Sequence, residues 1–179
     1  KNSESKTVEE ELKAQMQFLL AKNYYGNKRY DVARSEYQTV INRYADTAFA
    51  VEAQFGIGET FMAQKVYDQA EKVFEKLAGS QDTEIIVRAE FLRGMLAHRR
   101  GDNDEARDIF RTVLERVPNI ELANKALFNL SEVYGDEERY MDQLQLLMTV
   151  GRLGRVSKRL HGPGMPLSIV VQDSDLGIS

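Results

Sequence analysis

The segments Tyr30-Asp31-Val32-Ala33, Tyr67-Asp68-Gln69-Ala70 and Asn103-Asp104-Glu105-Ala106 decide the fold, because they are three copies of one pattern in a chain of 179 residues. Four residues after the alanine of each copy stands an aromatic residue, namely Tyr37, Phe74 and Phe110. A weaker fourth copy runs from Tyr140 to Gln143 and is followed by Leu147. Repetition at a fixed period of this length is typical of solenoids, whose units bury one continuous core only by stacking.

A second repeated segment precedes each copy and contains a phenylalanine. Successive phenylalanines are 37, 36 and 37 residues apart, and they are Phe18, Phe55, Phe91 and Phe128. Apolar residues around them recur at intervals of three and four, which is the helical period. Each unit is therefore predicted to be two amphipathic helices joined by a short turn. The expected repeats lie near residues 14–47, 51–84, 87–120 and 124–157.

These segments resemble the tetratricopeptide repeat family, and the resemblance extends from about Ala14 to Val150. The family has a small residue within the first helix, where the second helix packs, and the corresponding residues here are Ala21, Gly58, Gly94 and Ser131. The small residue of the second helix is Ala33, Ala70 and Ala106, whereas the fourth copy departs with Gln143 at this position and with Leu147 at the aromatic position. The resemblance implies an all-α, right-handed superhelical solenoid of about four helix-turn-helix repeats.

The resemblance is closest to repeats of bacterial periplasmic and outer-membrane-associated proteins, such as the Tol–Pal-associated and outer-membrane-assembly lipoprotein families. It rests on the spacing, on the stretch 44–59, and on polar or aliphatic residues where the family prefers a bulky aromatic. Those residues are Gln17, Gln54, Glu90 and Leu127. The subset implies a module of a larger bacterial protein in the periplasm or cell envelope.

The flanks of the repeats carry their own signals. Thr7-Val8-Glu9-Glu10 has the pattern of a capping box, so the first helix is expected to run from about Val8 to Tyr25, with residues 1–6 as a linker and the solenoid over 7–160. Residues 161–179 are predicted to be a Gly/Pro linker and a strand-like tail, because Leu167 to Gln172 is rich in β-branched residues. This tail is either the start of a truncated β-domain or a segment that packs on the last helix.

Composition excludes several classes of protein. Hydrophobic residues make up 42% and charged residues 29% of the chain, which is typical of a globular protein, and cysteine is absent. A net charge of -4 argues against a nucleic-acid partner, because phosphate contacts require an excess of Lys and Arg. No apolar run approaches the length of a membrane span, so membrane insertion is not expected.

No spacing of residues predicts catalysis, a metal site or a cofactor. His98 and His161 stand alone, and no phosphate-binding glycine loop is present. Asp173 and Asp175 are favoured as an ordinary turn over a calcium loop, because the glycine that follows is one place early. A basic stripe is favoured as a solvated helix end over an anion contact, and it comprises Arg152, Arg155, Lys158 and Arg159.

By the family resemblance, the recurring phenylalanines and the residues four and seven places further on face the concave groove, where a peptide or partner helix binds. The candidate partner-binding residues are therefore Phe18, Lys22, Tyr25, Phe55, Glu59, Met62, Phe91, Met95, His98, Phe128 and Glu132. Alternatively, the phenylalanines pack between repeats and meet no ligand. A carboxylate clamp is excluded, because it requires Lys in place of Phe18 and Asn in place of Lys22.

Three functions are consistent with these patterns. The leading interpretation is a non-catalytic scaffold that binds a peptide or a partner domain in the groove. The second is a structural spacer or self-association module that positions a following β-domain. The third is the recruiting arm of a larger enzyme. A binding groove requires exposed apolar side chains at Phe55, Met62, Phe91 and Met95, whereas a spacer does not.

Overall fold

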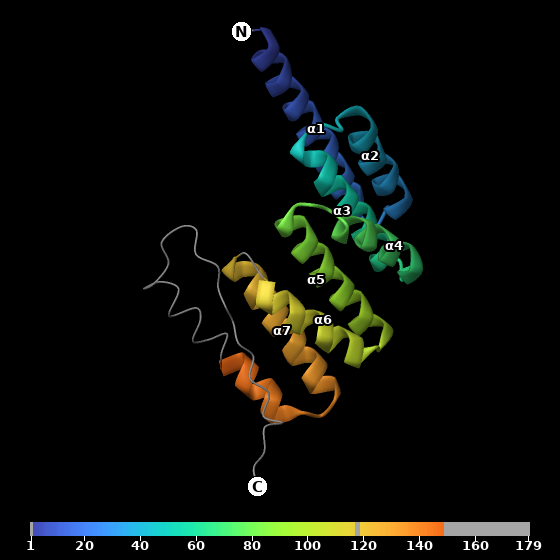
Figure 1. Ribbon diagram of the computed structural model, residues 1–179. Coiled ribbons are helices and arrows are strands. Elements are labelled where there is room, and N and C mark those ends of the chain that lie inside the picture. Colours follow the sequence, from blue (N-terminus) through green and yellow to red (C-terminus); the bar gives the residue numbers. More distant parts are fainter. Residues whose placement is uncertain (1, 117–118, 149–179) are drawn as a thin grey trace. The chain divides into compact units, whose positions relative to one another are not determined.

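The computed structural model describes residues 2–116 and 119–148, with side chains from residue 7 onward, and these residues are helical except for short connections (Figure 1). The helices are α1 Asn2–Gly26, α2 Tyr30–Arg43, α3 Ala48–Ala63, α4 Tyr67–Ala78, α5 Thr83–Arg100, α6 Asn103–Arg116 and α7 Ile120–Asp136. A further helical stretch covers residues 140–148. The predicted all-α fold of helix-turn-helix units is confirmed. The basic stripe and the strand-like tail lie outside the described residues.

The chain divides into two compact units, Lys1–Leu77 and Ala78–Ser179. In the first unit α2 packs against both α1 and α3, and α1 also contacts α3. The second unit repeats this arrangement, with α6 packed against α5 and α7, and α5 in contact with α7 (Figure 1). In each unit, therefore, the first helices of successive repeats are neighbours, and the second helix lies between them on one side.

One turn conformation ends the first helix of every repeat. Lys28, Lys65, Gly101 and Glu138 all have positive φ values, between 59° and 89°. In each case the amide of the next residue donates to the carbonyl five residues back, as in Arg29 N to Tyr24 O at 2.9 Å. This is the Schellman arrangement, which satisfies carbonyls at a helix end and needs a left-handed residue. Only Gly101 is a residue that takes this conformation without strain.

The small residues predicted in the first helices let the aromatic residues of the second helices approach closely. A Cβ atom built at Gly58 would lie 2.4 Å from Cε1 of Phe74, and one built at Gly94 would lie 2.8 Å from Cε1 of Phe110. Phe74 and Phe110 are fully buried. In each of these two repeats the two helices therefore pack closely, because glycine leaves room for the aromatic ring.

The fourth repeat exchanges the sizes of two facing residues. Where the other second helices carry a fully buried alanine, this repeat has Gln143. Its amide nitrogen would lie 2.7 Å from a Cβ atom built at Gly135. In the earlier repeats the position of Gly135 is occupied by larger residues, Tyr25, Met62 and His98. Gly135 therefore provides the space that Gln143 fills.

The start of α1 differs from the prediction. The helix begins at Asn2 rather than at about Val8, so residues 2–6 of the expected linker continue the helix and Thr7 lies inside it. The pattern Thr-x-x-Glu favours a helix that starts at Thr7. It does not stop the helix from starting earlier when the preceding residues can also be helical.

Candidate functional site

The residues predicted to bind a partner in the first unit lie on α1 and α3, and they differ widely in exposure. Phe18 is half-buried, with its ring centroid 5.6 Å from those of Tyr37 and Phe49. Lys22 is exposed, and its Nζ lies 5.8 Å from the Phe18 centroid. Tyr25 is half-buried, with its ring centroid 5.7 Å from that of Tyr30. In α1, then, the predicted set presents a cation beside the exposed part of an aromatic ring.

In α3 the predicted residues belong mainly to the core. Phe55 and Met62 are buried, and only Glu59 between them is partly exposed. Glu59 lies close enough to Tyr37 for its negative charge to influence that phenol: burial is the larger cause that raises the pKa of Tyr37, to about 12, and Glu59 and Tyr25 add to it. Phe55 and Met62 cannot contact a ligand unless the packing opens.

In α5 the predicted phenylalanine is again internal. Phe91 is buried and its centroid lies 5.9 Å from that of Phe110. Met95 and His98, one and two turns further along α5, are partly exposed. Of the four residues chosen to distinguish a groove from a spacer, Phe55, Met62 and Phe91 are thus buried, and Met95 alone is partly accessible.

The second unit brings the remaining predicted residues together on α7. Phe128 is 54% exposed, and Glu132 is also exposed one turn further along the helix. Another turn along, Asp136 Oδ2 accepts a hydrogen bond from His98 Nε2 at 2.7 Å. This bond ties the end of α5 to the end of α7. Phe128, Glu132, Asp136 and His98 are called the α7 stripe below.

Asp136 was missed by the sequence analysis. It lies 38 residues after His98, outside the positions that the family resemblance assigns to the groove. The available signal was its helical spacing, since Phe128, Glu132 and Asp136 recur every four residues and share one face of a helix. The stripe can offer the ring of Phe128 to an apolar side chain and the carboxylate of Glu132 to a basic group.

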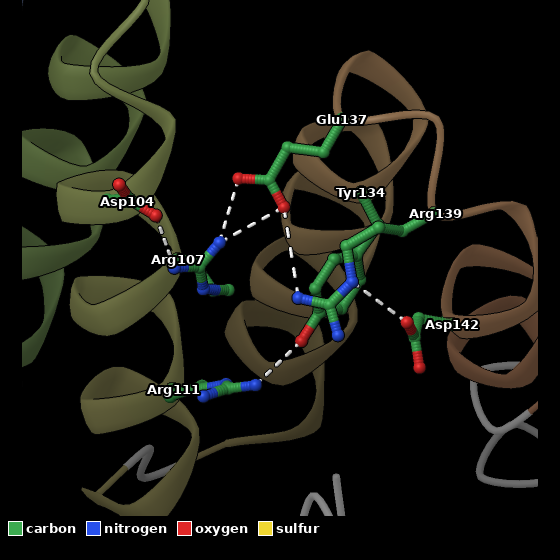
Figure 2. Close-up of polar contacts among 7 residues, drawn as sticks. All are labelled: Asp104, Arg107, Arg111, Tyr134, Glu137, Arg139 and Asp142. Atoms are coloured by element: carbon green, nitrogen blue, oxygen red, sulfur yellow. Dashed lines mark hydrogen bonds and ion pairs between the residues drawn. The ribbon is translucent and has the colours of Figure 1, made fainter. Parts of the chain in front are cut away.

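A second polar cluster lies between α6, α7 and the helix that follows (Figure 2). Arg107 Nη1 donates to both oxygens of Glu137, at 2.7 and 3.0 Å, and Arg107 also contacts Asp104. On the other side of Glu137, Arg139 Nη1 lies 3.9 Å from its Oε2, and Arg139 Nε donates to Asp142 at 2.9 Å. The cluster joins successive repeats.

The same cluster uses stacking as well as charge. The guanidinium of Arg139 lies 4.5 Å from the centroid of Tyr134, whose hydroxyl accepts from Arg111 Nη2 at 2.8 Å. Burial alone would lower the pKa of Arg107, but its hydrogen bond to Asp104 and the charge of Glu137 raise it. Because every carboxylate drawn in Figure 2 already faces an arginine, the arrangement serves packing between helices.

Within residues 2–116 and 119–148, no group of three or more His, Asp or Glu side chains is placed to hold a metal ion. In the same residues, no helix combines the length and the apolar character needed to cross a membrane.

The structure therefore defines a class, the helix-hairpin repeat solenoids. A family model described as a tetratricopeptide repeat-like domain matches residues 4–127, and the chain belongs to this family. The family and the fold indicate a protein-interaction scaffold with protein partners. A comparison with curated protein sequences gave no significant match.

Solved structures share this fold at low sequence identity. The apo form of RapI superposes with a TM-score of 0.66 at 20% identity, over 87% of this chain and 61% of RapI. BtubC from P. vanneervenii gives 0.60 at 18% identity, over 92% and 72%. A putative kinesin light chain with nearly identical TPR-like repeats, from Podosopora anserina, gives 0.60 at 15% identity, over 83% and 77%. This chain thus spans about three-fifths of RapI.

Proposed function

We propose that the chain is a non-catalytic module of a larger bacterial cell-envelope protein and that it binds a segment of a partner protein through its first-helix face. The observation that carries the proposal is the α7 stripe, where Phe128 is 54% exposed beside two carboxylates. An exposed aromatic surrounded by polar groups is a common anchor in protein interfaces. The envelope location rests on the resemblance of the repeats to periplasmic proteins.

The stripe determines which ligand is expected. Phe128 offers a flat apolar surface, and Glu132 and Asp136 lie one and two turns further along α7. An extended or helical segment with one apolar side chain, followed by Lys or Arg, matches this order. Asp136 is already bonded to His98, so Glu132 is the carboxylate assigned to the basic group.

In the first unit, Phe18 and Lys22 would make additional contacts. The two residues differ in chemistry from the α7 stripe, because here a cation lies over the ring. Tyr25, Glu59 and the partly exposed Met95 of the second unit stay as proposed contacts of smaller area. Phe55, Met62 and Phe91 are assigned to the core by their burial and are no longer proposed as anchors.

The experiment is a capture of partner proteins from envelope extract with the parent chain and with two variants. Phe128→Ala removes the anchor without opening the core, and Val66→Ala is the matched control, since Val66 is also exposed (42%) but lies in the turn before α4. A specific partner should be lost with Phe128→Ala, be weakened by Glu132→Lys, and be retained with Val66→Ala. Circular dichroism confirms that each variant is folded.

If all variants capture the same proteins, the spacer function is favoured. The observation on its side is the burial of Phe55, Met62 and Phe91, the result expected when the recurring residues pack between helices. A Phe55→Ala, Phe91→Ala variant would not separate the two functions, because truncation of a buried phenylalanine costs about 3–5 kcal/mol of stability.

A further inference from the structure

The first helix presents an apolar face to solvent. Met16 is 64% exposed and Leu19 is 54% exposed. Leu12 and Leu20 share this exposed face, which is opposite to the buried Ala14 and Ala21. The four residues follow one another at intervals of four, three and one, so they form one stripe on the helix. They are called the N-terminal face.

The repeat register shows what this face is built to contact. Thirty-seven residues further on, the four residues of the N-terminal face correspond to Phe49, Ala53, Gly56 and Ile57 of α3. There, all four positions face the core that α3 shares with the preceding repeat. Ala53 shares the buried core with Tyr37 and Val40 of α2, Phe49 and Ile57 pack against the same core, and Tyr37 lies over Gly56. The N-terminal face therefore has the register of a surface that receives a second helix.

The same chain carries a second helix whose own contact positions are exposed. In α2 and α6, Arg34 and Arg107 reach the following first helix: Arg34 lies 4.5 Å from the Phe61 centroid, and Arg107 bonds to Glu137. The equivalent residue in the helical stretch 140–148 is Leu144, which is 52% exposed. Leu147, equivalent to Tyr37, is 42% exposed.

Leu144 is apolar where α2 and α6 carry an arginine, and Leu147 is an exposed aliphatic residue where the earlier repeats have a buried aromatic ring. Leu144 replaces the arginines, and next to it Met141 and Met148 replace polar residues of α2, Asp31 and Gln38. Met141 and Met148 are also exposed. Leu144 and Leu147, flanked by these methionines, are called the C-terminal face. Burial of these apolar side chains against a partner would be favourable relative to their exposure to water.

We propose that the N-terminal face of one chain binds the C-terminal face of a second copy, so that copies associate head to tail. The interface would repeat the contact of α2 with α3, in which a second helix lies on the next first helix. Leu147 would take the place of Tyr37 above Leu19, and Leu144 would lie near Tyr24, the equivalent of Phe61. This is a heterologous contact, and such contacts form open chains or rings rather than closed two-fold dimers.

The proposal is independent of partner binding by the α7 stripe, because the residues of the two faces lie outside it. In this interface, repeats of different copies would join as repeats within one chain do.

Two substitutions in the full 179-residue chain test the proposal. Leu19→Glu blocks the N-terminal face, and Leu144→Glu blocks the C-terminal face. Both positions are exposed, so a folded monomer is expected from each, and circular dichroism checks this. Val66→Glu is the control, since aspartate and arginine occupy its equivalent positions at Asp102 and Arg139. Sedimentation velocity measures mass against concentration for each chain.

The mass of the parent and of the control should increase with concentration beyond that of the 20.4-kDa chain. Each single variant should associate at least about tenfold more weakly, because an unpaired carboxylate would be buried. A mixture of the two variants should form a 1:1 complex and grow no further, because each retains one intact face.

Three results would overturn the proposal. In the first, the parent remains a monomer at every concentration. In the second, Leu144→Glu associates as the parent does while Leu19→Glu does not, which would indicate two-fold pairing of α1. In the third, the mixture of variants forms no complex.

Discussion

Tyr37 is a buried residue of α2 whose neighbours come from both α1 and α3. Its ring is buried, lies 5.6 Å from the Phe18 centroid, and occupies the space left by the missing side chain of Gly56. It therefore joins α1, α2 and α3 in one core. A phenol in this position is stable only while it is neutral, because burial penalises the charged form.

This environment predicts a specific sensitivity to alkali. Burial, with Glu59 and Tyr25 adding to it, raises the pKa of Tyr37 from 10.0 to about 12. The protonated phenol is favoured in the folded chain, so its contribution is complete below pH 10 and is lost as the pH rises through 12. The free energy of unfolding should fall by about 2–3 kcal/mol over this interval.

Urea unfolding at pH 9 and pH 11.5 measures the effect. Tyr37→Phe keeps the ring in its site but has no proton to lose, so it should remove this part of the pH dependence. Other tyrosines and lysines titrate in both chains and cancel in the comparison. Equal losses of stability in the parent and in Tyr37→Phe would contradict the prediction.

Among the glycines that the structure describes, Gly58 lies nearest to an aromatic ring. A methyl group at this position would lie 2.4 Å from Phe74 Cε1, so Gly58→Ala should lower the free energy of unfolding by about 1–3 kcal/mol. The matched control is Gly26→Ala, because a Cβ atom at Gly26 has nothing within 4 Å. It should leave stability unchanged or raise it by up to about 1 kcal/mol. The prediction fails if urea unfolding shows both variants to be equally stable.

At the scale of the element, the sequence predicted the helices better than it predicted their ends. The intervals of three and four, together with the recurring Ala33 and Tyr37, indicated the helix pairs because they encode the buried face directly. The capping pattern at Thr7 led to a wrong helix start, because a local cap competes with continued helix and the pattern cannot say which is more stable. The exchange of Gly135 and Gln143 involves two helices, so it appears only when their residues are aligned in space.

The link between α6 and α7 gives a prediction at this scale. Glu137 receives two hydrogen bonds from Arg107, and both side chains are less than one-fifth exposed. Glu137→Ala should reduce stability by about 1–2 kcal/mol, since a hydrogen bond to a charged group is lost in a partly buried site. Glu137→Gln should cost less, because Gln64 accepts from Arg34 at the equivalent place in the first unit.

Urea midpoints at low and high salt measure this effect. The control is Glu121→Ala, which breaks a fully exposed pair with Lys125 on the same helix and should change stability little. The loss of stability in Glu137→Gln should become smaller in high salt, whereas the difference between Glu137→Ala and Glu137→Gln should persist, because screening weakens the charge but leaves the hydrogen bond. Similar losses for Glu137→Ala and Glu121→Ala would show that the link contributes nothing.

At the scale of the whole molecule, the repeat period was enough to predict the fold. Units that carry the same apolar positions bury them in the same way, which is by stacking on their neighbours. The candidate site was predicted only in part. Phe55, Phe91 and Phe128 occupy equivalent positions, yet the first two are buried and the third is exposed. A recurring residue has a similar sequence pattern around it in every copy. Its burial, however, depends on the helices that pack against it, and these differ along the chain. Neither Asp136 nor the N-terminal face was identified, although both follow a helical period.

The division into two compact units predicts how a local defect spreads. In a repeat array each unit is stabilised mainly by its nearest neighbours, so destabilisation at one place should decay along the chain. Gly58→Ala acts within the first unit, and its effect should appear as faster amide hydrogen exchange in α1 to α4. Amides of α6 and α7 should retain their protection, since their core, around Phe110 and Tyr134, is untouched. Exchange followed by mass spectrometry at peptide resolution measures both regions in one sample, with Glu137→Ala as the reciprocal variant that should expose α6 and α7 instead. Equal loss of protection in all helices with both variants would show that the chain unfolds as one cooperative body.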